Sequence, residues 1–150
     1  MKFRNSVFRL IIVAVLLLSF SQVVTGQQSV NLQKIAGSSG AINALHHLEN
    51  HLYVGAGAQI MRLDVTDPSS PILESTVSLD DQVRAMAVTG NIVYAAIGFS
   101  GLQIVDFSNR TSPILRSLID TPDFATDLAV DDERIYVADR FGGLRIIYVT

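Results

Sequence analysis

Apolar residues in this chain fall into short runs separated by clusters of Gly, Asn, Asp, Ser and Pro. The runs 92–97 (IVYAAI) and 102–107 (LQIVDF) are rich in β-branched and aromatic residues, a composition typical of strands. The 3.6-residue apolar spacing of helical repeats is absent from these segments. The pattern therefore predicts an all-β chain.

The stretch 91–119 recurs, whole or in part, on either side of itself. Tyr53, Tyr94 and Tyr136 stand at equivalent positions, so the spacing between copies is about 41 to 42 residues. A period of this length that carries several short strands is typical of propeller blades. We expect β-propeller-type blades of four antiparallel strands. About three blade equivalents make an incomplete propeller, because closed propellers have about four to eight blades.

The copies define three units, at approximately 42–82, 83–124 and 125–150, within a repeat region that covers 27–150. In the first unit we expect strands at 42–47, 51–55, 59–65 and 72–77. In the second unit we expect them at 83–88, 93–97, 102–107 and 114–119. In the third unit we expect them at 126–130, 135–138 and 144–149, without a fourth strand. Leu32 falls one period before Leu73, which predicts that residues 32–36 form the last strand of a blade.

The expected strand 102–107 is apolar on both faces. Leu102 and Ile104 point to one side, and Val105 and Phe107 point to the other. A strand of this kind is buried on both faces, as when each sheet packs between two neighbouring sheets.

Two glycines and one polar residue complete this pattern. Gly101 and Gly143 stand at equivalent positions where a tight hairpin requires a positive φ. Gln103 corresponds to Met61 and Arg145, so we expect a variable position that tolerates substitution.

Residues 1–26 have the plan of a secretory signal peptide. Three basic residues, Lys2, Arg4 and Arg9, precede an apolar run at 10–20 and small residues that end at Gly26. We expect cleavage after Gly26 and a mature protein that is secreted, periplasmic or at the cell surface. An uncleaved anchor is the weaker alternative, because the apolar run is short for a membrane span. No membrane span is expected after removal of the leader.

Composition excludes several kinds of chemistry. The chain has no Cys, which excludes disulfides, thiolate catalysis and cysteine-ligated metals. The net charge is −3, and three of the eleven Lys and Arg residues lie in the leader, so the mature chain is more acidic. Nucleic-acid binding is not expected, because it requires a clustered basic face.

The stretches 101–122 (GLQIVDFSNRTSPILRSLIDTP) and 137–147 (VADRFGGLRII) resemble the LVIVD repeat, a propeller-type repeat of secreted and cell-surface proteins. The resemblance implies a fold and a location, and it carries over no catalytic residue. The first unit departs from the repeat at Arg62, where an apolar residue is usual. The third departs at Tyr148, which stands where the other units have Asp64 and Asp106.

Three histidines are the first candidates for a metal site. His46 and His47 are adjacent, so they face opposite sides of a strand and cannot both bind one ion without a bend. His51 lies across the expected hairpin, and Glu49 is the only nearby carboxylate. Zinc or copper needs three or four ligands, so ordinary strand positions are the preferred interpretation.

Acidic residues are the second group of candidates. They are Asp80, Asp81, Asp120, Asp123, Asp127, Asp131, Asp132, Glu133 and Asp139. Loop oxygens of this kind bind calcium, and a pair of carboxylates hydrolyses glycosidic bonds. The regular spacing of a calcium loop is absent, and turn formation explains these residues with fewer assumptions.

Asn109 begins the triplet Asn109-Arg110-Thr111, which fits the acceptor for N-glycosylation. The preferred alternative is an Asx turn equivalent to the one expected at Asp67.

The sequence predicts a non-catalytic module that binds an extracellular protein or glycan. We assign no catalytic, cofactor-binding or metal-binding residue. One alternative is a secreted hydrolase or lyase that acts on sugar polymers through carboxylates such as Asp81 and Asp123. Another is a truncated fragment of a longer surface propeller. Truncation is preferred to a homodimer, in which the strand 32–36 of each chain would complete the last blade of the other and close a ring, because Tyr148 breaks the usual turn.

Overall fold

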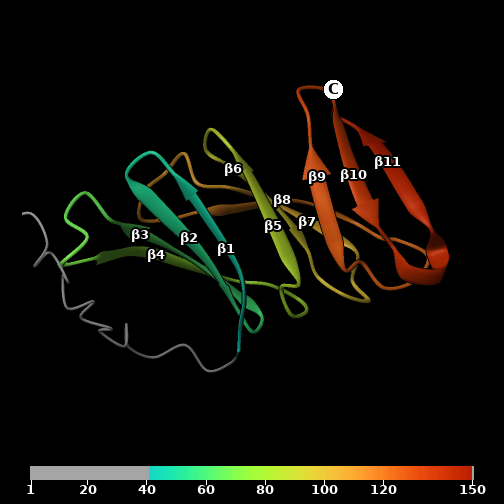
Figure 1. Cartoon of the computed structure of the whole chain (residues 1–150), viewed down its shortest axis with the longest axis horizontal. Coiled ribbons are helices and arrows are strands. Elements are labelled where there is room, and N and C mark those ends of the chain that lie inside the picture. The colour runs from blue at the N-terminus through green and yellow to red at the C-terminus, as the bar shows by residue number, and fades with distance from the viewer. Residues whose placement is uncertain (1–40, 150) are drawn as a thin grey trace, which may run out of the picture. The chain divides into compact units, whose positions relative to one another are not determined.

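The computed structural model describes residues 41–149, which form eleven strands in three antiparallel sheets (Figure 1). Each strand pairs only with its neighbours in sequence, and the three sheets do not close into a ring. The prediction of an all-β chain built of propeller-type blades is confirmed. The leader 1–26, the cleavage position and the strand 32–36 lie outside the described residues.

The first sheet holds β1 (Ile42–Leu48), β2 (His51–Ala56), β3 (Gln59–Asp64) and β4 (Ile72–Ser78). The second holds β5 (Ala85–Thr89), β6 (Ile92–Ala96), β7 (Leu102–Asp106) and β8 (Ile114–Ile119). The third holds β9 (Asp127–Val130), β10 (Arg134–Ala138) and β11 (Leu144–Tyr148), with a short 3₁₀ turn, η1 (Arg140–Gly142), before β11.

The start of β5 differs from the prediction. The strand begins at Ala85 rather than Val83, because the Val83 N–H donates to the carbonyl of Gly57 in the first sheet (2.9 Å). This bond belongs to the connection between sheets. The pattern of apolar residues does not distinguish a connection of this kind from the first residues of a strand.

Hydrophobic side chains fill the space between successive sheets. Val105 and Phe107 pack with the first sheet, where the rings of Phe107 and Tyr53 meet edge to face with centroids 5.4 Å apart. Leu102 and Ile104 pack with the third sheet around Ile135. The second sheet is therefore covered on both faces, as the apolar pattern of 102–107 predicts. The first strands of the sheets, β1, β5 and β9, lie next to one another (Figure 1).

The structure corrects two details of β7. Ile104 is half-buried rather than fully buried. Gln103 is 3% exposed, and its Nε2 donates to the carbonyls of Ser117 (2.8 Å) and Ile104 (3.1 Å). The expectation that Gln103 lies at a permissive position is wrong, because its side chain shares the buried face of Val105.

Aspartates terminate the third strand of the first two sheets. Asp64 Oδ1 accepts hydrogen bonds from the Thr66 N–H (2.8 Å) and hydroxyl (2.6 Å). Asp106 Oδ1 accepts one from the Ser108 N–H (2.7 Å). These are Asx turns, in which a carboxylate replaces the next ladder partner. The third sheet has Tyr148 at this position.

Replacement of Asp106 by Asn is expected to destabilise the fold in a pH-dependent way. Hydrogen bonds from Ser108, and then from Arg116, lower the pKa of Asp106 to about 2. The pKa of Asp in an unfolded chain is about 3.9. The stabilisation by the Asp106 carboxylate is therefore complete above that pH and is lost as the pH falls towards 2. The melting temperature of Asp106→Asn should lie below that of the wild type at pH 7. The difference in melting temperature between the variant and the wild type should narrow between about pH 4 and pH 2.

Thermal melts by circular dichroism across this range test the prediction. Asp132→Asn, in the exposed β9–β10 turn, is the matched control and should show no gap at any pH. A gap for Asp106→Asn of constant size from pH 7 to pH 2 would contradict the role of its carboxylate.

Candidate functional site

The site begins with a β-bulge that recurs in the first two sheets. The register shifts between Arg62 and Leu63 in the first sheet, which leaves Glu74 as the extra residue of β4. The same shift in the second sheet leaves Arg116 as the extra residue of β8. A bulge turns its extra side chain in a direction that regular pairing does not allow.

The two bulges carry opposite charges. In the second sheet, Arg116 Nη2 lies 2.6 Å from Asp106 Oδ2, so the pair is satisfied within one sheet. In the first sheet Glu74 takes the place of Arg116, and it cannot pair with Asp64, the equivalent of Asp106. A cation must come from elsewhere.

Arg62 is the first of these cations. Its Nε donates to Glu74 Oε2 (2.8 Å), and its Nη1 donates to the carbonyl of Phe107 in the second sheet (2.8 Å). Arg62 is only 2% exposed, and its guanidinium carbon lies 5.8 Å from the centroid of the Phe107 ring. The ion pair is therefore part of the packing between the two sheets.

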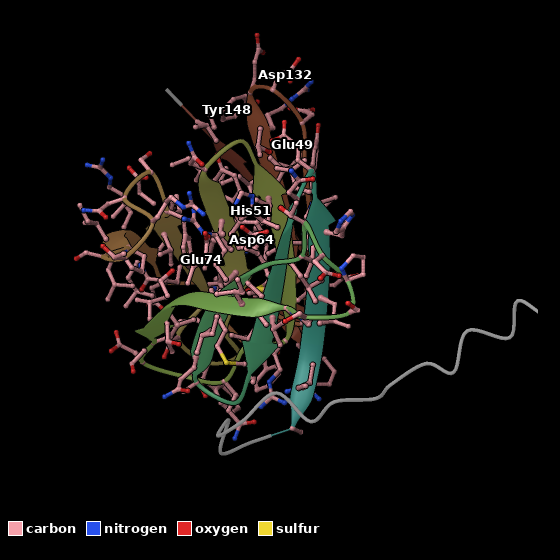
Figure 2. All side chains as sticks on the ribbon, turned by 90° about the vertical axis from the view of Figure 1, so that its left-hand side faces the viewer. Glu49, His51, Asp64, Glu74, Asp132 and Tyr148 are labelled. Atoms are coloured by element: carbon pink, nitrogen blue, oxygen red, sulfur yellow. The ribbon has the colours of Figure 1, made fainter. Side chains whose placement is uncertain are left out.

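Arg110 is the second cation, and it comes from the β7–β8 linker. Its Nε donates to Glu74 Oε1 (2.9 Å), its Nη2 contacts the same oxygen, and Nη2 lies 3.7 Å from Asp64 Oδ2. His51 Nε2 lies 3.5 Å from Glu74 Oε2. Figure 2 shows His51, Asp64 and Glu74 gathered at this place. The network of Arg62, Glu74, Arg110 and Asp64 thus joins two sheets.

The network holds both carboxylates in the ionised form. Burial raises the pKa of Glu74, but the hydrogen bond from Arg110 and the charge of Arg62 outweigh it, so the pKa is lowered overall. Hydrogen bonds from Thr66 lower the pKa of Asp64. The hydrogen bond to Glu74 raises the pKa of Arg110. A general acid for glycoside hydrolysis needs a raised pKa, so this arrangement does not suit one.

A cavity of about 410 Å³ lies beside the network. It is lined by Asn50, His51, Arg62, Asp64, Thr66, Asn91, Phe107, Ser108 and Arg110. Three of these side chains come from the β1–β2 and β5–β6 hairpins, and the other six come from β3 and from the linkers that follow β3 and β7. The lining presents amide, hydroxyl, imidazole, carboxylate and guanidinium groups, which can bind a polar ligand.

One atom of the lining residues lacks a partner. Arg62 Nη2 is buried and makes no hydrogen bond to any residue in 41–149. A buried donor without an acceptor costs about 1–3 kcal/mol, and more when it is charged. Nη2 has essentially no accessible surface, so this unpaired donor lies within the packing between the two sheets and not at the surface of the cavity.

A family model for the LVIVD repeat matches residues 40–78, 82–121 and 124–149. The chain belongs to the LVIVD repeat family. The resemblance seen in the sequence is confirmed, and the pocket lies where the first two LVIVD repeats meet. A comparison with curated proteins finds no match.

Solved structures with propeller-type folds are similar to the LVIVD chain. The crystal structure of the computationally designed Ika8 protein has a TM-score of 0.61 and 17% identity, over 71% of this chain and 33% of that one. A chain of the Mitotic Checkpoint Complex has a TM-score of 0.65 and 18% identity, over 75% of this chain and 37% of that one. The LVIVD chain thus spans about a third of the length of these structures, and at this identity the likeness shows the fold alone.

The histidines are not brought together by the LVIVD fold. His47 is exposed on β1, His46 is half-buried, and His51 contacts Glu74. Glu49 lies in the exposed β1–β2 turn with φ at +53° (Figure 2). Within residues 41–149 no three His, Asp or Glu side chains gather as metal ligands.

The acidic residues divide between opposite ends of the sheets. The linkers between sheets and the start of β9 carry Asp80, Asp81, Asp120, Asp123 and Asp127, and Asp139 follows β10 at the same end. The β9–β10 turn carries Asp131, Asp132 and Glu133 at the other end. The structure therefore does not place all of them at one site.

Two of the acids tie loops together. Asp139 is fully buried and accepts hydrogen bonds from the Thr121 hydroxyl (2.7 Å) and the Asp123 N–H (3.2 Å). Asp123 Oδ2 accepts one from the Phe141 N–H (2.9 Å). These contacts fasten the β8–β9 linker to η1, which is a structural role.

Asn109 lies on an exposed turn of the second LVIVD repeat. Its Oδ1 accepts hydrogen bonds from the N–H (3.1 Å) and the hydroxyl (3.2 Å) of Thr111. Asp67 does the same with Ser69 in the first repeat (2.9 and 2.7 Å). Asn109 is thus an Asx-turn residue, and its glycosylation stays a prediction.

The ionic network was missed in the sequence, although one signal of it is visible there. Arg62 stands out as a departure from the LVIVD pattern. Glu74 stands one period before Arg116, so the same comparison shows an exchange of charge. Two departures on strands that pair with each other could have indicated an ion pair.

Proposed function

We propose that this LVIVD chain is a non-catalytic binding module that is secreted or held at the cell surface. The observation that carries the proposal is the polar cavity between the first two repeats, which is lined by residues of both. A concave site lined with hydrogen-bonding groups suits a glycan better than it suits the flat surface of a partner protein. An extracellular glycan is therefore the proposed partner.

A glycan array probed with the purified full chain tests this function. We expect binding to a subset of glycans, and no change in the glycans after prolonged incubation. Turnover of a glycan that is lost in Asp81→Asn or Asp123→Asn would contradict the non-catalytic function and support the hydrolase or lyase alternative. Absence of binding to every glycan would overturn the proposed partner class.

Location outside the cytoplasm rests on residues 1–26. Among the described residues, no helix has the length and apolar character needed to cross a membrane. Intact-mass analysis of material from the native host should find an N-terminus at Gln27. A membrane-bound form that retains residues 1–26 would show an anchor instead.

We also propose that the module forms a homodimer that closes a ring. Leu144 and Ile146 on β11 are 66% and 49% exposed, whereas their equivalents Leu102 and Ile104 pack on the next sheet. Among residues 41–149, β11 pairs only with β10, so we propose that the strand expected from the sequence at 32–36 pairs with its other edge in a second copy. Light scattering should give a compact dimer, and a stable monomer would contradict the closed ring. Soluble aggregates would favour the truncated-fragment alternative.

A further inference from the structure

We infer that the second and third repeats carry a further glycan site, in which two exposed phenylalanines stack on successive sugar rings of a neutral, linear glucan. The site is the loop-end patch, made up of Asp81, Phe99, Asp123, Phe124 and Phe141. It lies at the end of the sheets opposite the cavity between the first two repeats. The inference rests on the proposed function as a glycan-binding module, and it adds a second site and names the class of sugar.

Phe99 and Phe141 stand at equivalent positions of the second and third repeats, and both are exposed to solvent. Phe99, in the β6–β7 turn, is 69% exposed, and Phe141, in η1, is 98% exposed. A tight turn does not require an aromatic ring at either position, and water is an unfavourable environment for one. Exposed apolar groups that gather beside polar ones mark a binding surface. The two rings therefore form a binding feature that recurs with the repeat.

The ring of Phe99 is held in place by Phe124 of the β8–β9 linker. The two rings meet edge to face with centroids 4.7 Å apart. The guanidinium carbons of Arg84 and Arg140 lie 4.9 Å and 4.6 Å from the centroid of the Phe124 ring, so cation–π contacts hold this second ring. A ring that is fixed before binding loses little side-chain entropy when a ligand stacks on it.

An aspartate from the preceding linker lies beside each of the two turns. Asp81 Oδ2 would lie 3.0 Å from a Cβ placed on Gly98, the neighbour of Phe99. Asp123, the equivalent of Asp81, accepts a hydrogen bond from the Phe141 N–H at Oδ2 (2.9 Å). Asp81 Oδ2 and Asp123 Oδ1 accept no hydrogen bond from residues 41–149. Each turn thus combines an exposed ring with a carboxylate oxygen that can accept from a ligand hydroxyl.

This combination matches the surfaces of a glucose-type sugar ring. A pyranose with equatorial hydroxyls has C–H groups on its two faces and hydroxyls around its edge. The C–H groups carry a small positive charge and pack on the negative face of an aromatic ring, while the hydroxyls donate to a carboxylate. The patch holds the guanidiniums of Arg84 and Arg140 beside its carboxylates, so a neutral ligand suits it better than a charged one.

The recurrence of the ring and the carboxylate indicates a ligand that is itself a repeat. Phe99 with Asp81 and Phe141 with Asp123 are the same pair in consecutive repeats. A linear glucan presents the same sugar ring many times, so two of its rings can occupy two equivalent sites at once. The first repeat has only Gly57 and Ala58 in its β2–β3 turn, and it therefore lacks the aromatic ring.

Isothermal titration of the full chain with cellohexaose and with glucose tests the inference. Cellohexaose is a linear chain of six glucose units. We expect it to bind at least about tenfold more tightly than glucose, because the second ring binds as part of the same molecule. Phe99→Leu and Phe141→Leu should each weaken cellohexaose binding about two- to tenfold, because leucine keeps an apolar side chain and removes the aromatic face.

Tyr148→Leu is the matched control. It removes an aromatic ring that is 71% exposed at the opposite end of β11, beside the β9–β10 turn, and it should leave the cellohexaose affinity unchanged (Figure 2). Phe141→Leu should keep the melting temperature of the wild type, because the Phe141 side chain is almost wholly in water. This variant therefore tests the inference even where Phe99→Leu folds poorly.

Four outcomes would overturn the inference. The first two are equal affinity for cellohexaose and glucose, and unchanged cellohexaose affinity in Phe99→Leu and Phe141→Leu. The third is loss of cellohexaose binding in Asn91→Ala/Ser108→Ala alone, which would place the glucan in the cavity between the first two repeats. The fourth is absence of cellohexaose binding. Binding of other glycans on the array would then leave the proposed function intact and reject only the loop-end site.

Light scattering of Phe99→Leu and Phe141→Leu separates a glycan from a second copy of the chain as the occupant. We expect the variants to have the same oligomeric state as the wild type. Loss of a dimer in these variants, with unchanged affinity for cellohexaose, would assign the loop-end patch to a contact between copies.

Discussion

Gly101→Ala is expected to lower the free energy of unfolding more than Gly143→Ala does, although the two glycines are equivalent in the repeats. Their φ angles are +82° and +80°, so an alanine is strained at both. A Cβ at Gly101 would lie 2.3 Å from the carbonyl oxygen of Ile119 and 2.8 Å from the Thr121 nitrogen. A Cβ at Gly143 would meet no atom within 4 Å. Backbone atoms of the β8–β9 linker must therefore move in one variant and not in the other.

The expected sizes follow from this difference. Backbone strain alone should cost Gly143→Ala about 1–3 kcal/mol. The clash should cost Gly101→Ala about a further 1–3 kcal/mol. Urea denaturation of both variants measures the two values. Equal losses in the free energy of unfolding would show that the β8–β9 linker moves away from the new Cβ at little energetic cost.

Glu74→Leu is expected to destabilise the chain by about 3–5 kcal/mol, because it leaves a buried guanidinium without its carboxylate. The Arg62 side chain is only 3% exposed and cannot become neutral. The carbonyl of Phe107 would be its one remaining hydrogen-bond partner among the contacts described above. Arg110 would also lose its main acceptor. Urea denaturation at pH 7 measures the loss.

The second sheet provides the matched control. Arg116→Leu removes the bulge residue at the equivalent position, but the Arg116 side chain is 57% exposed, so the loss should be much smaller. Arg62→Ile/Glu74→Arg should recover most of the stability that Glu74→Leu loses, because no buried charge is left alone. If the double variant is as unstable as Glu74→Leu, the network stabilises the chain through the packing of its side chains and not through the pairing of its charges.

The boundaries of the repeats could be read from the sequence with little error. Tyr53, Tyr94 and Tyr136 mark equivalent strands, and turns rich in Gly, Asp and Asn separate the runs. Antiparallel neighbours joined by short turns depend on local preferences, which are present in the sequence itself. The start of β5 at Ala85 is an exception, because a contact with the first sheet determines it.

The candidate site was not predictable to the same extent. The sequence drew attention to histidines and aspartates, which the structure disperses over two ends of the sheets or uses to fasten loops. Residues that do meet at the cavity come from two repeats, and each is ordinary by itself. Gln103 shows the same limit, because its burial follows from the sheet that packs against its face.

The sequence by itself determined the all-β class, the period, the family and the Asx turns, since each depends on residues that are neighbours along the chain. Only the tertiary structure decided that Arg62, Glu74 and Arg110 form one network. Two steps produce it: a bulge turns Glu74 towards Arg62, and the packing of the second sheet brings Arg110 from 36 residues away. Register shifts and sheet packing depend on the total free energy of many contacts, so no local pattern records them.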